Sequence, residues 1–292
     1  MLYRLAAAKA PALALTDETP AQRLKVADAW RGWWKDAAAQ TDLAKINLDD
    51  ALQGINVICD ETGGGRVWAC RADGKPLWVI NGTNAWDAQL LPNGHVLIAE
   101  HNAGQVTERD LTGKVIWTKT VGNSVTTCFR LPDGNTFIGT FSELMIVDPK
   151  GTSVFSYKNP NGGLIARAHR LRNGHLLFAC DGNKIVELDA QLKQVRSLNV
   201  KSDGDSWISV EPLSGTRFLV APYGAQHVIE LDASGMTIWE CKVRTPMSAV
   251  RLPNGNTLVG SDQDRAVIEY DRAGKEVWRV KTEGGVRCVR RF

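Results

Sequence analysis

The chain has 292 residues, of which 43% are hydrophobic, and this is enough to bury a substantial core. Its 35 basic and 32 acidic residues give a net charge of +3, which is too balanced to indicate nucleic acid as the main partner. No apolar run reaches the ~18 residues of a membrane span. Arg4 and Lys9 interrupt the apolar start, so the sequence shows no clear signal peptide and leaves the compartment unknown.

Residues 1–46 are predicted to form a short helical N-terminal segment. Thr19 followed by Pro20 is typical of an N-cap and a first helical position, and predicts a helix over residues 21–39. A shorter helix is expected over residues 2–10. Because the sequence opens in helix, one interpretation is that this segment is the remnant of a helical-repeat domain in a longer chain.

Three tryptophans lie within five residues of the predicted helix, at Trp30, Trp33 and Trp34. So much aromatic surface is costly to leave in water. We expect these side chains to dock on the rest of the protein or on a neighbouring helical domain, in preference to forming an aromatic ligand site.

Residues 47–292 are predicted to form a β-propeller. A Leu-Pro-Asn-Gly-like turn recurs with spacings of 40, 40, 41 and 40 residues, at Pro92, Pro132, Arg172, Leu213 and Pro253. A period near 40 residues that divides into four short strands is typical of a propeller blade. We name the strands of each blade a to d, from the axis outward.

The first blade lacks its innermost strand where it begins in the sequence. Strands b, c and d are predicted over residues 55–60, 66–71 and 76–80, with no strand a before them. The segment Val286–Arg291 aligns with the strand a that begins at Thr126, so we expect the C-terminus to complete blade one. The predicted fold is an all-β, six-bladed ring closed by its last strand, which removes exposed sheet edges.

The repeated residues are explained by the scaffold. Asn-Gly and Asp-Gly turns link a to b, and an aromatic residue on strand d is expected to pack between blades, with Arg196 as the exception in blade four. One column of strand a holds only small residues, as crowding at the axis requires: Ala88, Cys128, Ala168, Ser209, Ala249 and Cys288. The constant turns share one face, and the variable d–a and b–c loops share the other.

The candidate site lies where strand a enters from the variable face. Trp86 and Trp207 belong to opposite blades and are expected to face each other across the channel mouth. Aromatic walls with a few charged groups are typical of a small-ligand pocket, and two arginines could hold an anion. The alternative is that the arginines pair with nearby carboxylates and the tryptophans only pack. The candidate residues are Trp86, Asp87, Thr127, Arg167, Trp207, Ser248 and Arg287.

A second candidate site is a metal site at the ends of strand b in blades one and two. Asp60, Glu100 and His101, with Asp87 nearby, could bind Ca²⁺ or another hard cation, or supply acid–base chemistry. The alternative is that these are ordinary loop residues. No other cofactor is predicted.

The six cysteines show no metal-binding spacing and no Cys-x-x-Cys motif. Cys59 and Cys70 flank a Gly-rich turn and could form a disulfide across a hairpin. The alternative interpretation is a pair of small buried thiols.

The units LPNGNTLVG…AVIEYDRAGKEVW and ERDLTGKVIWTKTVG resemble the repeats of bacterial PQQ-like and NHL-like propellers over about residues 50–292. Quinoprotein dehydrogenases of this kind have more blades and a vicinal cysteine pair, so the resemblance implies that PQQ is not bound here. Arylsulfotransferase propellers are more distantly similar. The sequence most resembles uncharacterised exported propellers that follow HEAT-like helical repeats, which implies an exported or periplasmic protein beside a helical-repeat domain.

Three hypotheses about function follow. The first is a non-catalytic binding propeller that uses its variable face for a small anionic ligand or a protein partner. The second is an enzyme of the lactonase, lyase or sulfotransferase type that acts at the channel mouth with or without a metal. The third is a purely architectural domain.

Overall fold

The computed structural model describes residues 20–38, 54–122, 124–160, 163–201 and 207–292. The chain divides into two compact units, Met1–Gly54 and Ile55–Phe292. The first unit contains helix α2 (Pro20–Ala37), which has Lys35 in its last turn, where a cation favours the helix dipole. The shorter helix predicted over residues 2–10 lies outside the described residues. Trp30 is buried and packs edge-on against Trp33 at 5.5 Å.

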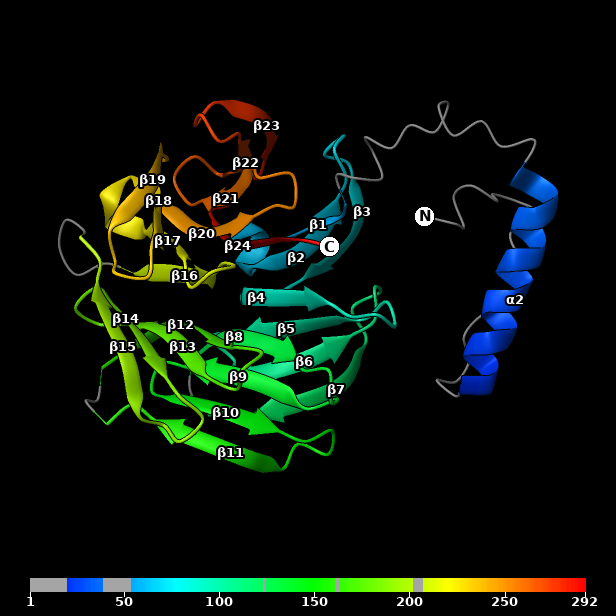
Figure 1. The fold of residues 1–292 in the computed structure, drawn as a ribbon, viewed down its shortest axis with the longest axis horizontal. Coiled ribbons are helices and arrows are strands. Elements are labelled where there is room, and N and C mark those ends of the chain that lie inside the picture. The colour runs from blue at the N-terminus through cyan, green and yellow to red at the C-terminus, as the bar shows by residue number, and fades with distance from the viewer. Residues whose placement is uncertain (1–19, 39–53, 123, 161–162, 202–206) are drawn as a thin grey trace. The chain divides into compact units, whose positions relative to one another are not determined.

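The second unit contains six antiparallel sheets of four strands within the described residues, which confirms the six-bladed all-β propeller (Figure 1). Strands a to d of blades one to three are β24 (Val286–Arg291), β1 (Asn56–Asp60), β2 (Arg66–Cys70) and β3 (Pro76–Asn81); β4 (Ala85–Leu90), β5 (Val96–Glu100), β6 (Gln105–Arg109) and β7 (Val115–Thr120); β8 (Val125–Arg130), β9 (Thr136–Thr140), β10 (Glu143–Val147) and β11 (Ser153–Lys158). Those of blades four to six are β12 (Ile165–Arg170), β13 (Leu176–Cys180), β14 (Lys184–Leu188) and β15 (Gln194–Asn199); β16 (Ile208–Pro212), β17 (Phe218–Pro222), β18 (His227–Leu231) and β19 (Thr237–Lys242); β20 (Pro246–Arg251), β21 (Thr257–Ser261), β22 (Ala266–Tyr270) and β23 (Glu276–Lys281).

The C-terminal strand closes the ring as the repeat alignment predicts. β24 pairs antiparallel with β1, with Ile58 opposite Val289, and the backbone N–H of Ile55 donates to the carbonyl of Phe292 at 2.8 Å. Figure 1 shows β24 lying beside β1 at the point where the two ends of the ring meet. Because β24 pairs with β1 on the side opposite β2, the inner edge of β1 is not left open to another chain.

A repeated contact joins neighbouring blades on the side of the constant turns. In blade five, Glu230 of strand c lies opposite Trp239 of strand d, and Arg251 of blade six pairs with Glu230 at 2.8 Å while its guanidinium stands 4.4 Å from the Trp239 ring. Such an arginine is stabilised by a charge-assisted hydrogen bond to the carboxylate and by a cation–π contact with the aromatic ring. We call this arrangement the interblade triad, and its further copies are Glu108–Trp117–Arg130 and Glu269–Trp278–Arg291.

Blade four uses the same parts in a different order. Arg196 occupies the tryptophan position, pairs with Glu187 at 3.4 Å and stacks on Phe218 of blade five at 5.2 Å. The exception seen in the sequence is therefore a triad in which the arginine comes from strand d of the preceding blade.

We predict that Glu230→Gln lowers the free energy of unfolding by about 2 kcal/mol at pH 7, because Arg251 is left buried with a weaker partner. Three arginines hold the pKa of Glu230 below its ordinary value, against the effect of burial, at 2.7 to 2.9 Å. A carboxylate whose pKa is lower in the folded than in the unfolded state stabilises the fold at pH values above its unfolded pKa of about 4.3. This stabilisation is lost as the pH falls through the folded pKa. Urea unfolding at pH 7 and pH 3 should show the difference between the proteins shrinking in acid. Glu240→Gln, at a half-exposed carboxylate, is the control, and a difference that persists unchanged at pH 3 would contradict the prediction.

Candidate functional site

A fully buried carboxylate stands at the axis of the ring. Asp87 accepts hydrogen bonds from Arg290 Nε at 3.0 Å, from Arg167 Nη2 at 3.1 Å, and from the backbone N–H groups of Ala88 and Cys128 at 3.0 and 3.1 Å. Burial alone would raise the pKa of Asp87, but Arg167 and Arg290 hold it below its ordinary value. We call Asp87, Arg167 and Arg290 the axial ion triad, and it joins strands a of blades two, four and one.

Above the axial ion triad, four aromatic rings fill the channel mouth. Trp86 stacks flat on His101 with ring centres 3.7 Å apart, and meets Trp207 edge-on at 4.8 Å. Phe141 lies 6.1 Å from Trp207. His101 Nδ1 hydrogen-bonds the carbonyl of Val125 at 2.9 Å, while burial lowers the pKa of the imidazole below its ordinary value and so favours its neutral form. We call Trp86, His101, Phe141 and Trp207 the aromatic plug.

Charged and hydroxyl groups surround the aromatic plug on one side. Arg287 lies over the Trp86 ring at 5.7 Å and pairs with Glu61, with its Nε 2.9 Å from the carboxylate. The hydroxyl of Tyr223 donates to Asp262 at 2.8 Å, and this hydrogen bond raises the pKa of Tyr223. We call Glu61, Tyr223, Asp262 and Arg287 the mouth rim.

Two further sequence-predicted mouth residues serve the scaffold. The hydroxyl of Thr127 accepts the backbone N–H of Ala168 at 3.3 Å, and Ser248 accepts that of Val289 at 3.1 Å. Each hydroxyl therefore links strand a of its own blade to strand a of the next one.

Four of the mouth residues were not predicted from the sequence. Each directly follows strand b of its blade: Glu61, Phe141, Tyr223 and Asp262 follow β1, β9, β17 and β21. The same position holds His101 after β5 and Asp181 after β13. The variation at this position is the signal that could have identified them. A position whose residue changes between otherwise similar blades is not required for the blade structure, so it is available for function.

The two carboxylates of the predicted metal site each bind groups of their own blade. Asp60 accepts from Arg66 Nε at 3.1 Å and from the indole of Trp68 at 2.8 Å. Glu100 accepts from Thr107 at 2.5 Å and from Arg109 Nε at 3.1 Å. Within the described part of the chain, no group of three or more His, Cys, Asp or Glu side chains is arranged to hold a metal ion.

The disulfide interpretation of Cys59 and Cys70 is wrong. In the β1–β2 register, Cys59 lies opposite Val67 while Cys70 lies opposite Asn56, so the two are offset by three positions. This offset is about 10 Å along the strand, beyond the reach of a disulfide. All six cysteines are free, and burial raises the pKa of Cys59. The interpretation as small buried thiols holds.

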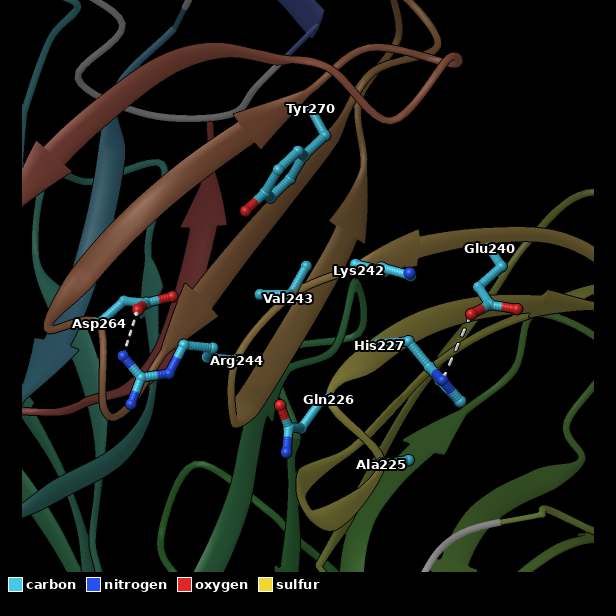
Figure 2. A pocket seen from close by; sticks show the side chains of 9 residues that line it. All are labelled: Ala225, Gln226, His227, Glu240, Lys242, Val243, Arg244, Asp264 and Tyr270. Atoms are coloured by element: carbon cyan, nitrogen blue, oxygen red, sulfur yellow. Dashed lines mark ion pairs between the residues drawn. The ribbon is translucent and has the colours of Figure 1, made fainter.

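A groove of about 470 Å³ opens between blades five and six. Figure 2 shows Arg244 paired with Asp264 at one end, and His227 paired with Glu240 at the other, each at 3.5 Å. Burial raises the pKa of Tyr270, which lines the same groove, to about 12. Because most of its charges compensate one another, this groove offers little net attraction to a charged ligand.

The repeat and the closed ring define a six-bladed propeller with PQQ-like repeats, and comparisons with known proteins agree. The family model described as outer membrane protein assembly factor BamB matches residues 172–291 and confirms the predicted PQQ-like repeat. A comparison with curated protein sequences finds no significant match.

Solved structures share the fold. A protein of unknown function from Bacteroides caccae superposes with a TM-score of 0.65 at 16% identity, over 81% of this chain and 98% of the other. A catalytically inactive variant of virginiamycin B lyase from Staphylococcus aureus gives 0.56 at 12% identity, over 79% and 86%. The WD40 propeller domain of Doa1 gives 0.56 at 11% identity, over 80% and 81%. These identities establish the architecture alone. Among the described residues, no helix is long and apolar enough to cross a membrane.

We predict that Asp87→Asn lowers the free energy of unfolding by about 3–5 kcal/mol, because Arg167 and Arg290 are then buried without a countercharge. Asp133→Asn is the matched control, since Asn93, Asn173 and Asn254 occupy the same turn position in other blades, and it should change stability by less than about 0.5 kcal/mol. Denaturant unfolding at pH 7 measures both variants. A loss below about 1 kcal/mol for Asp87→Asn would show that the axial ion triad is dispensable.

Proposed function

We propose that the protein is a non-catalytic recognition propeller that binds a protein partner through the aromatic plug and the mouth rim. The observation that carries this proposal is the state of the mouth: its tryptophans are partly exposed, while its acid–base groups are already paired. Trp86, Trp207 and Arg287 are partly accessible on the variable face. Tryptophan and arginine beside each other at a half-buried surface are the residues most often found at interaction hot spots.

The pairing of the charged groups argues against catalysis at the axis. Asp87 is neutralised by two arginines and is fully buried. Glu100 is committed to Arg109, and His101 is held by stacking and by its bond to Val125. A general acid or base must be able to exchange a proton with the substrate. Each of these side chains is instead hydrogen-bonded to another group of the protein.

The family match supports the same choice. The matching family model is described as an outer membrane protein assembly factor, and a role in assembly is compatible with a surface that binds other proteins. On this proposal the protein acts in the bacterial envelope, as an exported scaffold for a protein assembly. The lyase structures share the fold at 12–13% identity and support only the architecture.

The test compares two mouth variants with a matched surface control. Trp207→Ala and Arg287→Glu should each weaken capture of the partner from an extract of the organism that encodes the protein by about 30-fold, the effect of a hot-spot loss of about 2 kcal/mol. Arg172→Glu, at an exposed arginine on the constant face, should bind like the wild type. The measurement is quantitative proteomics of the captured proteins over a range of bait concentrations.

Two outcomes would contradict the proposal. One is capture that is equal for both mouth variants and the wild type, which would move recognition away from the mouth. The other is turnover of a lactone, a cyclic ester or a sulfate ester that His101→Ala abolishes, which would favour the enzyme hypothesis.

A further inference from the structure

One blade interface departs from the rule that the other five follow. In five of the six blades, the fourth residue of the c–d turn is a glycine with left-handed backbone, and it packs on the fifth residue of strand d in the preceding blade. A Cβ at these glycines would lie 3.0 to 3.8 Å from that side chain, in the pairs Gly74–Val280, Gly113–Ile80, Gly151–Lys119, Gly235–Leu198 and Gly274–Cys241. The absence of a side chain is thus what lets the hairpin lie close to the neighbouring blade.

The interface between blades three and four has two large side chains at this place. Leu192 occupies the glycine position with φ 63°, a conformation that leucine rarely adopts, and makes the same turn bond to the carbonyl of Asp189. The fifth residue of β11 is Tyr157. Because leucine and tyrosine cannot approach as glycine and its partner do, the c–d hairpin of blade four is held off blade three.

A second link is also missing at this interface. The indole N–H of the docking tryptophan donates to a turn carbonyl of the next blade in three places: Trp117 to Pro149, Trp239 to Arg272 and Trp278 to Ala72, at 2.8 to 3.0 Å. Blade three has Phe155 in this position, which has no such donor. The two substitutions together leave the interface open on its outer side.

The opening is a groove of about 600 Å³, which lies within the range of about 300–1,000 Å³ that is usual for small-ligand sites. Tyr157, Phe178 and Leu192 line it together with Val186 and Leu188. The rings of Tyr157 and Phe178 lie 5.9 Å apart. These side chains give the groove one apolar wall, part aromatic and part aliphatic, while polar side chains, among them Asn159, Gln194 and Ser197, line the rest.

A single cation among the described lining residues stands at one end of the groove. Lys184 lines it and forms no ion pair with any described residue, whereas Asp181, which lines the same groove, accepts a hydrogen bond from the backbone N–H of Leu164 at 2.6 Å. An ammonium beside an apolar wall recognises a carboxylate attached to an apolar body.

We propose that the groove between blades three and four binds a small amphipathic carboxylate, with its aromatic or aliphatic body against Tyr157 and Leu192 and its carboxylate at Lys184. This site lies on the side of the ring, and it goes beyond the recognition function proposed for the mouth. The proposal depends on no residue of the aromatic plug or the mouth rim.

The test uses 3-phenylpropionate and its neutral amide as probes, with binding measured by protein-observed NMR titration. The acid should bind with a Kd at least tenfold below that of the amide. Lys184→Gln should abolish this preference, while Lys242→Gln, in the groove between blades five and six, should leave it unchanged. Leu192→Gly restores the glycine of the other blades, lets the hairpin close, and should weaken binding of both probes at least tenfold.

Each result decides for or against the site. Since Leu192→Gly also relieves a left-handed leucine, this variant should melt no lower than the wild type, and lost binding cannot then be ascribed to unfolding. The proposal is overturned if Leu192→Gly binds the acid like the wild type, if Lys184→Gln keeps the preference for the acid, or if neither probe shifts resonances at the groove at about 10 mM, well above the Kd of about 1 mM for weak fragments.

Discussion

The pairing of β24 with β1 is the interaction on which the rest of the structure depends. Without it, blade one would lack its innermost strand, and β1 and β24 would each have an unpaired edge. The closing strand also carries functional groups to the axis, because Arg290 completes the axial ion triad and Arg287 completes the mouth rim. Closure and site formation are therefore the same event: the strand that seals the sheet of blade one also neutralises Asp87 and flanks Trp86.

The buried charges of the molecule lie where neighbouring blades pack closely, at the axis and at the blade interfaces. Every interblade triad and the axial ion triad set an arginine against a carboxylate and, in most cases, an aromatic ring. Asp87 and Glu230 are almost completely buried, at 0% and 1% exposure, yet both carry depressed pKa values. Burial of such groups is tolerated because each has several donors, and the pairs fix how blades are placed around the ring.

The repeat was sufficient to predict the fold, because the residues that form the turns and the core recur in every blade of the sequence. Closure was also predictable, since Val286–Arg291 aligns with other copies of strand a. The pairings between side chains across the ring were not predictable from the sequence. The contact between Asp87 and Arg290 joins residues 203 positions apart, and depends on how six strands converge at the axis. Sequence spacing along one blade carries no information about that distance.

The mouth and the side groove were predictable to different degrees. The mouth was located from the variable start of strand a, but four of its residues were found only in the structure, although the position after strand b varies just as plainly: Glu61, Phe141, Tyr223 and Asp262. Leu192 breaks a column of glycines in the sequence. The groove that results also depends on Tyr157 of the facing blade, and only the packing of the two blades shows that both side chains line the same groove.

The placement of the closing strand sets an order of events for a chain made from its N-terminus. Blades two to six can each assemble from contiguous sequence as it emerges, whereas blade one waits for residues 286–291. Until then the mouth lacks Arg287, and Asp87 lacks one of its two arginines. A partner that binds the mouth rim would therefore distinguish a closed ring from an open one, so recognition would also act as a check that closure has taken place.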